Sequence, residues 1–308
     1  MTDAARDHGD TQTPLRPVST FFGARVADIE DLRPGNVAAI GVYCDHYSAG
    51  RPGGRFAARQ LRYASTISDM SVPQSVVDLG DFNVFPLEPE RTLEFLSEQS
   101  RRIIATGAKL FALGGDYSIS SAIINGIARE IGATSLAVIR ISRRFDLLPK
   151  ALNQTDAPWR YSATNELSEN LSGGLSAVAL LGGRGTVAVE ERERASAAIV
   201  VPASRLVSVP GKAVHKARNE LERVADRFYL SVDTDVLAPR FGASALKSKH
   251  GGLSLAQLLA VLAALDGMPF VGAELTGHVP DLDVPGRAMT SQIARLAAKI
   301  LECMAGKA

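Results

Sequence analysis

The chain is arranged around the stretch Ser231-Val232-Asp233-Thr234-Asp235-Val236-Leu237-Ala238-Pro239. An apolar run, Phe228-Tyr229-Leu230, precedes it and indicates a buried strand. Alternation along a strand would place Asp233 and Asp235 on one face, with their Cα atoms roughly 6–7 Å apart. Such a pair of carboxylates suits divalent cations, and it requires a nearby positive charge because the two carboxylates repel each other. The alternative interpretation is an ordinary turn after a strand.

Short apolar runs recur along the chain with helical patterns between them: Ala39–Tyr43, Val76–Leu79, Leu110–Leu113, Leu136–Ile139, Ala177–Leu181, Ile199–Val201 and Phe270–Ala273. This α/β alternation predicts a parallel sheet covered by helices on both faces. A capping box at Ser254–Gln257 predicts the start of one helix. No Pro/Ser-rich linker divides the chain, so we predict a single domain over residues 18–308 after a flexible polar tail, residues 1–17.

Composition excludes several classes of function. The 34 basic and 33 acidic residues give a net charge of +1, so nothing favours nucleic acid or an anionic membrane as a partner. No apolar run approaches the roughly 18–20 residues that span a bilayer. The two cysteines provide neither a disulfide framework nor a zinc-binding spacing, and we expect a cytoplasmic location.

Unusual residues follow four of the predicted strands. Sites in open parallel sheets lie beyond the carboxyl ends of the strands, so these residues are expected to converge. They are Gly114–Ser118, Ser142–Asp146, the pair Asp233 and Asp235, and Glu274.

This ordered set resembles the ureohydrolase family, which includes arginase and agmatinase. The family motifs run as Gly-Gly-Asp-His-Ser, Asp-Ala-His-x-Asp, Ser-x-Asp-x-Asp-x-x-Asp-Pro and a glutamate on the last strand. Three flanking segments also resemble the family: Arg51–Phe56, which is similar to the agmatinase Arg-Pro-Gly-x-Arg-Phe loop, Val77–Asp81 and Gly251–Ser254. The resemblance implies an arginase-like three-layer αβα fold with a mainly parallel sheet of about eight strands.

The resemblance also implies a chemistry. Such enzymes use a binuclear metal centre, usually manganese, to convert water into a hydroxide that attacks a guanidinium carbon and releases urea. By position, Asp146, Asp233 and Asp235 match metal ligands. Glu274 matches the carboxylate that holds the cationic group of the substrate.

Other ligand positions depart from the family pattern. The first histidine is replaced by Tyr117, the bridging aspartate by Ser142 and the second histidine by Arg144. The third aspartate of the strand motif is Ala238, and residues 151–165, where a catalytic histidine is expected, contain none.

The departures change the expected charge of the site. Arg144 does not deprotonate and would repel a divalent ion in the same pocket. We therefore interpret Arg144, together with Arg143, as replacing the metals and neutralising the three aspartates through charge-assisted hydrogen bonds.

Three functions fit this pattern. The first is a non-catalytic subunit, a pseudoenzyme, that assembles with an active ureohydrolase paralogue into a trimer- or hexamer-type hydrolase of a guanidine or biguanide compound; metformin hydrolase is similar. This chain would then hold no cofactor, and a divalent metal, manganese or nickel, is expected in the active partner. The second is a self-sufficient divergent agmatinase-like hydrolase with one metal on Asp146, Asp233 and Asp235. The third is a ligand-binding or scaffold pseudoenzyme in which Glu274 still receives a cation.

Overall fold

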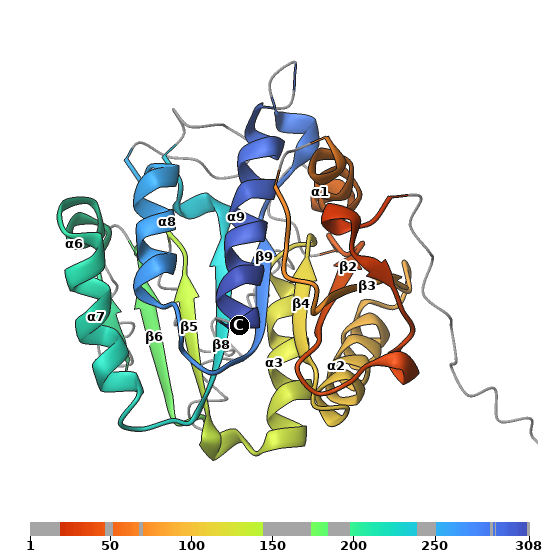
Figure 1. Ribbon diagram of the computed structural model, residues 1–308, viewed down its shortest axis with the longest axis horizontal. Helices are drawn as coiled ribbons and strands as arrows, with labels where there is room; N and C mark the ends of the chain where they lie inside the picture. Colours follow the sequence, from red (N-terminus) through yellow and green to blue (C-terminus); the bar gives the residue numbers. More distant parts are fainter. Residues whose placement is uncertain are drawn as a thin grey trace, which may run out of the picture.

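A single parallel sheet organises the protein. The computed structural model describes residues 19–46, 52–67, 70–143, 174–183, 198–238, 251–283, 286 and 288–306. Within these residues, nine strands form the sheet in the order β1-β3-β2-β4-β9-β8-β5-β6-β7 (Figure 1). Neighbouring strands all pair in parallel. The strands are β1 Arg25–Val26, β2 Val37–Val42, β3 Val76–Phe82, β4 Lys109–Leu113, β5 Leu136–Ile141, β6 Ala177–Leu181, β7 Ile199–Val201, β8 Arg227–Asp233 and β9 Phe270–Thr276.

The predicted strands are all present, and the prediction of a parallel sheet is confirmed. Several strands extend beyond their predicted carboxyl ends, because polar residues such as Asp81 and Glu274 continue the extended backbone. The expected number of about eight strands misses β1. This strand has only two residues, too few to show a periodic pattern, and it pairs with β3 at the edge of the sheet.

Helices cover both faces of the sheet. One apolar core lies under α1, α6, α7, α8 and α9, and the other lies under α2 and α3. Figure 1 shows α8 and α9 crossing in front of the strands. The helices are α1 Ala57–Thr66, α2 Pro89–Ala105, α3 Ser118–Ile131, α6 Ala203–Ser208, α7 Pro210–Leu221, α8 Leu255–Ala264 and α9 Ala288–Ala305. The three-layer αβα arrangement predicted from the family resemblance is therefore present.

The predicted start of α8 is confirmed. Ser254 Oγ accepts a hydrogen bond from Gln257 N at 3.1 Å, and Ser254 N donates to Gln257 Oε1 at 2.8 Å. This reciprocal pair satisfies two backbone N–H groups at the helix start, as a capping box does.

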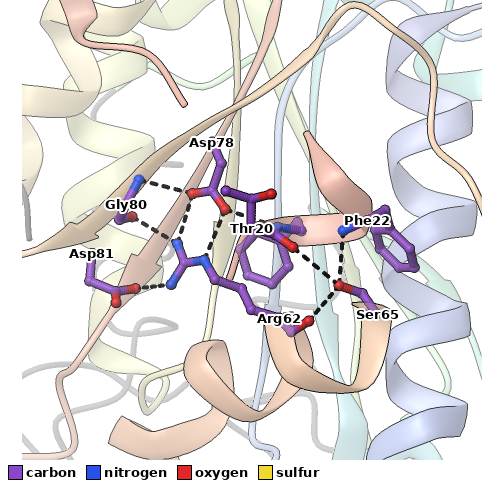
Figure 2. A network of polar contacts seen from close by, with 8 residues as sticks. Thr20, Phe22, Arg62, Ser65, Asp78, Gly80 and Asp81 are labelled. Carbon is purple, nitrogen blue, oxygen red and sulfur yellow. Dashed lines mark hydrogen bonds and ion pairs between the residues drawn. The ribbon is translucent and has the colours of Figure 1, made fainter. Parts of the chain in front are cut away.

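A buried ion network ties α1 to β3 (Figure 2). Arg62 donates from Nε and Nη2 to the two carboxylate oxygens of Asp78, at 2.9 Å each, and its Nη1 pairs with Asp81. Phe21 N also donates to Asp78, at 3.0 Å. The motif Val77–Asp81 therefore has a structural role here, since its two aspartates hold a helix and the start of the described chain against the sheet.

Some sequence predictions concern residues that the structure does not describe. The predicted tail, residues 1–17, lies outside the described residues, and the extent of the domain stays a prediction. Among the described helices, none is long and apolar enough to cross a membrane.

Candidate functional site

The carboxyl ends of four neighbouring strands form the candidate site. Strands β4, β9, β8 and β5 are adjacent in the sheet, so the residues at their ends meet at one edge, as the sequence predicts. The structure brings five predicted site residues together there: Tyr117, Ser142, Asp233, Asp235 and Glu274. The other two, Arg144 and Asp146, lie outside the described residues.

A glycine turn after β4 carries Tyr117 into the site. Gly114 and Gly115 have φ values of +85° and +78°, and a Cβ on Gly115 would lie 3.0 Å from the carbonyl oxygen of Cys44. Only glycine tolerates this conformation and contact. The turn leads into α3, and the hydroxyl of Tyr117 donates to Asp233 Oδ1 at 3.1 Å. A neutral hydroxyl donor thus stands where the family resemblance implies a metal-binding histidine.

Asp233 and Asp235 are close for a reason other than strand alternation. Strand β8 ends at Asp233, and a 3₁₀ turn, Thr234–Val236, follows. Asp235 N donates to Asp233 Oδ1 at 2.8 Å, so Asp233 caps this turn. The prediction that both aspartates continue one strand is therefore wrong, because the short side chain of Asp233 satisfies the backbone N–H of Asp235 and bends the chain.

Ser142 connects the two aspartates. Its Oγ donates to Asp233 Oδ2 at 3.2 Å and lies 3.4 Å from Asp235 Oδ1. Both carboxylates are fully buried. Burial first, and then the neighbouring charge of Asp235, raise the pKa of Asp233 well above its usual range. The pair therefore favours holding a proton on Asp233.

Arg143 supplies a positive charge to the pair. Its backbone N donates to Asp235 Oδ1 at 3.0 Å, and its Nε lies 3.6 Å from Asp235 Oδ2. Only 11% of its side chain is exposed. The sequence predicts that Arg144, together with Arg143, neutralises the aspartates through charge-assisted hydrogen bonds. Arg143 contacts Asp235 as an ion pair, without a hydrogen bond between Nε and Oδ2, and the role of Arg144 stays a prediction.

The described residues do not fit a binuclear metal centre. Both carboxylate oxygens of Asp233 and Oδ1 of Asp235 already accept hydrogen bonds from hydroxyl and backbone groups. The remaining oxygen, Asp235 Oδ2, accepts no hydrogen bond within the described residues, and the guanidinium of Arg143 lies 3.6 Å from it. Tyrosine and serine hydroxyls are neutral at ordinary pH, whereas manganese-type ions prefer carboxylates and imidazoles. In the described part of the chain, no three histidine, cysteine or acidic side chains are placed to hold a metal ion.

Glu274 lies deeper in the same face of the sheet. It is fully buried, and Ser120 Oγ from α3 donates to its Oε1. Burial raises the pKa of Glu274, while hydrogen bonds from Ser120 and Ser231 and the charge of Arg140 lower it in part. That Glu274 binds a substrate stays a prediction, but the carboxylate is already surrounded by groups of this chain.

Arg140 is the site residue that the sequence analysis missed. It lies in β5, is 1% exposed, and pairs in register with Ser231 of β8. The predicted strand ended at Ile139, one residue before it. The available signal was an arginine inside the apolar run Leu136–Ile141, where a charged side chain needs a buried partner.

Comparison with known proteins identifies the class. The model of the arginase family matches residues 35–306, so the chain belongs to this family of ureohydrolases. Among curated proteins, it is 26% identical over 286 residues to the mitochondrial guanidino acid hydrolase of Homo sapiens, covering 86% of this chain and 76% of the relative. It is also 26% identical over 292 residues to the mitochondrial agmatinase of Gallus gallus, covering 88% and 82%.

Solved structures confirm the fold. Proclavaminate amidino hydrolase from Streptomyces clavuligerus superposes with a TM-score of 0.79 and 22% identity, covering 94% of this chain and 98% of the other. A hypothetical agmatinase from Burkholderia thailandensis gives a TM-score of 0.77 at 24% identity, covering 92% and 90%. At these identities, the likeness supports the arginase-like fold and no finer assignment.

Proposed function

We propose that this protein is a non-catalytic ureohydrolase-family subunit of a heteromeric hydrolase acting on a guanidine or biguanide compound, similar to metformin hydrolase. One observation carries the proposal: the buried aspartates are partnered by the hydroxyls of Tyr117 and Ser142 and by the guanidinium of Arg143. Protein groups that partner the buried carboxylates would take the place of metal ions there, and without metal ions this site would not generate the attacking hydroxide.

The names of two relatives support the proposed substrate class. One is a guanidino acid hydrolase and the other a guanidinopropionase, and both align over most of the chain. The active partner would be a ureohydrolase paralogue that holds the divalent metal, manganese or nickel. In a trimer- or hexamer-type assembly, the surface of this chain would then form part of the subunit interfaces, and a closed symmetric oligomer needs every interface.

Co-expression tests the proposal. The chain is expressed alone and with its genomic neighbour, and each preparation is assayed for urea, guanidine and amine release from a panel of guanidino compounds. The chain alone is expected to be inactive, and the two chains together are expected to elute as one active heteromer. Separate homo-oligomers with activity unchanged by mixing would contradict the subunit proposal.

Metal analysis separates the proposal from a self-sufficient hydrolase. After dialysis against manganese, nickel or zinc, the isolated chain is expected to retain no stoichiometric metal. About one ion per chain, lost on Asp233→Ala, would instead favour a divergent hydrolase with a single metal.

A further inference from the structure

The segment Gly53–Phe56 borders the candidate site, and we call it the strap. It belongs to the loop Arg51–Phe56, whose resemblance to the agmatinase loop has no role in the proposed function. Gly54 O accepts a hydrogen bond from Gly115 N at 3.3 Å, so the strap contacts the glycine turn that carries Tyr117 into the site.

The strap packs on a second segment, the turn Gly277–Val279 that follows β9. A Cβ on Gly53 would lie 2.7 Å from Cγ1 of Val279, and a Cβ on Gly277 would lie 2.6 Å from Asp233 Oδ1. Only glycine permits such close approaches, since any other residue would bring a side-chain atom into them. The turn is therefore a wall of the site, and the strap covers this wall at Val279, which is 1% exposed.

The turn itself is anchored to the start of α9. His278 is 1% exposed, and its Nε2 lies 3.2 Å from Thr290 Oγ1. Thr290 donates from its backbone N and from Oγ1 to Asp283 Oδ2, at 2.7 and 2.8 Å. Because the hydroxyl proton of Thr290 points to Asp283, the hydroxyl oxygen is left to accept from His278 Nε2–H. A chain of three polar side chains thus fixes the turn from inside the protein.

The strap is held largely through one carboxylate. Asp45 Oδ2 accepts hydrogen bonds from Gly53 N at 2.9 Å and from Arg55 Nε at 2.8 Å, and Asp45 Oδ1 pairs with Arg55 Nη2. The Asp45 side chain is 1% exposed, whereas the Arg55 side chain is 47% exposed. Apolar burial contributes little, because two strap residues are glycines and Phe56 is 44% exposed. Charge-assisted hydrogen bonds therefore fix this segment.

We propose that the strap is a lid hinged at the start of α1, and that the ion pair of Arg55 with Asp45 latches it over the turn at the edge of the site. The strap leads directly into α1, whose first residues, Ala57 and Ala58, are fully buried and stay in place. A segment with few buried apolar contacts opens at a lower free energy than the whole domain. The inference concerns access to the site, and it holds for a non-catalytic subunit and for a self-sufficient hydrolase alike.

Thiol labelling of the full-length chain tests the proposal. Val279→Cys places a reporter thiol directly beneath the strap with a side chain of similar size. Native Cys303, buried in α9 with its Sγ 3.7 Å from Leu262 O, is the internal reference for global unfolding. The chain is treated with a thiol reagent at pH 8, and mass spectrometry of its peptides gives the labelling rate at each cysteine. When opening and closing are fast, this rate follows the population of the open state.

Adding Arg55→Met to the reporter chain is expected to raise the labelling rate at position 279 by roughly tenfold, as expected for the loss of a charge-assisted hydrogen bond. The rate at Cys303 is expected to stay unchanged. Asp45→Asn, which keeps the size of the side chain but removes its charge, is expected to give the same selective increase. Arg59→Met, the same substitution at an exposed arginine of α1, is the matched control and is expected to change neither rate.

Three results would overturn the proposal. A reporter thiol that reacts as fast as in the urea-unfolded chain while Arg55 is in place would show that no closed strap covers position 279. An unchanged rate in Arg55→Met would show that the ion pair is not a latch. Equal acceleration at position 279 and at Cys303 would show that the variant lowers global stability and that the strap does not open by itself.

Discussion

Replacing Asp233 by asparagine is expected to stabilise the protein at neutral pH. Asp233 Oδ1 accepts from Tyr117 at 3.1 Å and from Asp235 N at 2.8 Å, and an asparagine carbonyl can accept both. The new amide would donate to Ser142 Oγ, 3.2 Å from the present Oδ2. The Ser142 hydroxyl would then donate to Asp235 Oδ1, 3.4 Å away. The hydrogen bonds therefore survive while one buried negative charge is removed.

The magnitude follows from the raised pKa of Asp233. Burial, and then the charge of Asp235, hold this pKa well above its value in the unfolded chain, about 3.9. The contribution of Asp233 to stability is therefore fully present below about pH 4 and is lost as the pH rises through the folded-state pKa. Each pH unit in this window lowers the free energy of unfolding of the parent by about 1.4 kcal/mol relative to Asp233→Asn. In a chain of this size, 1 kcal/mol shifts Tm by roughly 2 °C.

Unfolding by heat and by urea between pH 4 and pH 8 measures the effect. The advantage of Asp233→Asn is expected to grow from near zero at pH 4 toward neutral pH. Asp226→Asn, an exposed aspartate just before β8, is the matched control and is expected to change stability by less than about 0.5 kcal/mol. An Asp233→Asn protein less stable than the parent at pH 7 would refute the reasoning, and loss of a bound metal in the same variant would identify Asp233 as a ligand.

Three further predictions concern other buried groups. Arg62→Met leaves Asp78 without its cation and is expected to reduce the free energy of unfolding by about 3–5 kcal/mol. The control Arg91→Met, at the exposed pair with Glu88, is expected to cost less than about 1 kcal/mol, and equal losses in urea titrations would contradict this prediction. Burial raises the thiol pKa values of Cys44 and Cys303 to about 12 and about 11, so neither is expected to react with a thiol reagent at pH 8 until the protein unfolds, and rapid labelling of the native chain would disprove it. Ser120→Ala removes the donor to Glu274 Oε1 and is expected to destabilise by about 1–3 kcal/mol in the same titrations; an unchanged midpoint would mean that another donor serves this oxygen.

The sequence predicts the fold well because each central strand is a continuous apolar run. Strands buried on both faces need apolar residues on both, so runs such as Leu110–Leu113 and Ala177–Leu181 are recognisable without an alternating pattern. The edge strand β1 is not predictable in the same way, since two residues carry no period and its pairing depends on the exposed edge of β3. Sequence patterns also miss the polar ends of strands, as at Asp81, because this residue is buried in its strand only through its tertiary contact with Arg62.

The site is predictable in its members but less so in its geometry. Parallel strand ends must converge, which places Tyr117, Ser142 and Asp233 together before any coordinates exist. The bend between Asp233 and Asp235 depends on one side chain capping a backbone N–H, and strand periodicity contains no such information. The position of Arg140 beside Ser231 depends on the register of β5 with β8, which only the assembled sheet defines.

If the proposed function holds, the buried arginines oppose metal binding more strongly than the missing ligands do. Replacing Ser142 by aspartate would restore a ligand type but would add a third carboxylate and remove the hydroxyl that serves both Asp233 and Asp235. Arg143 would still lie 3.6 Å from Asp235, and a guanidinium at that distance repels a divalent ion by energies on the kcal/mol scale even when the interaction is well screened. Arg140, which is buried in β5 of the same site, would add a second positive charge. A return to metal chemistry is therefore expected to require removal of both cations together with restoration of the ligands, and no single substitution does both.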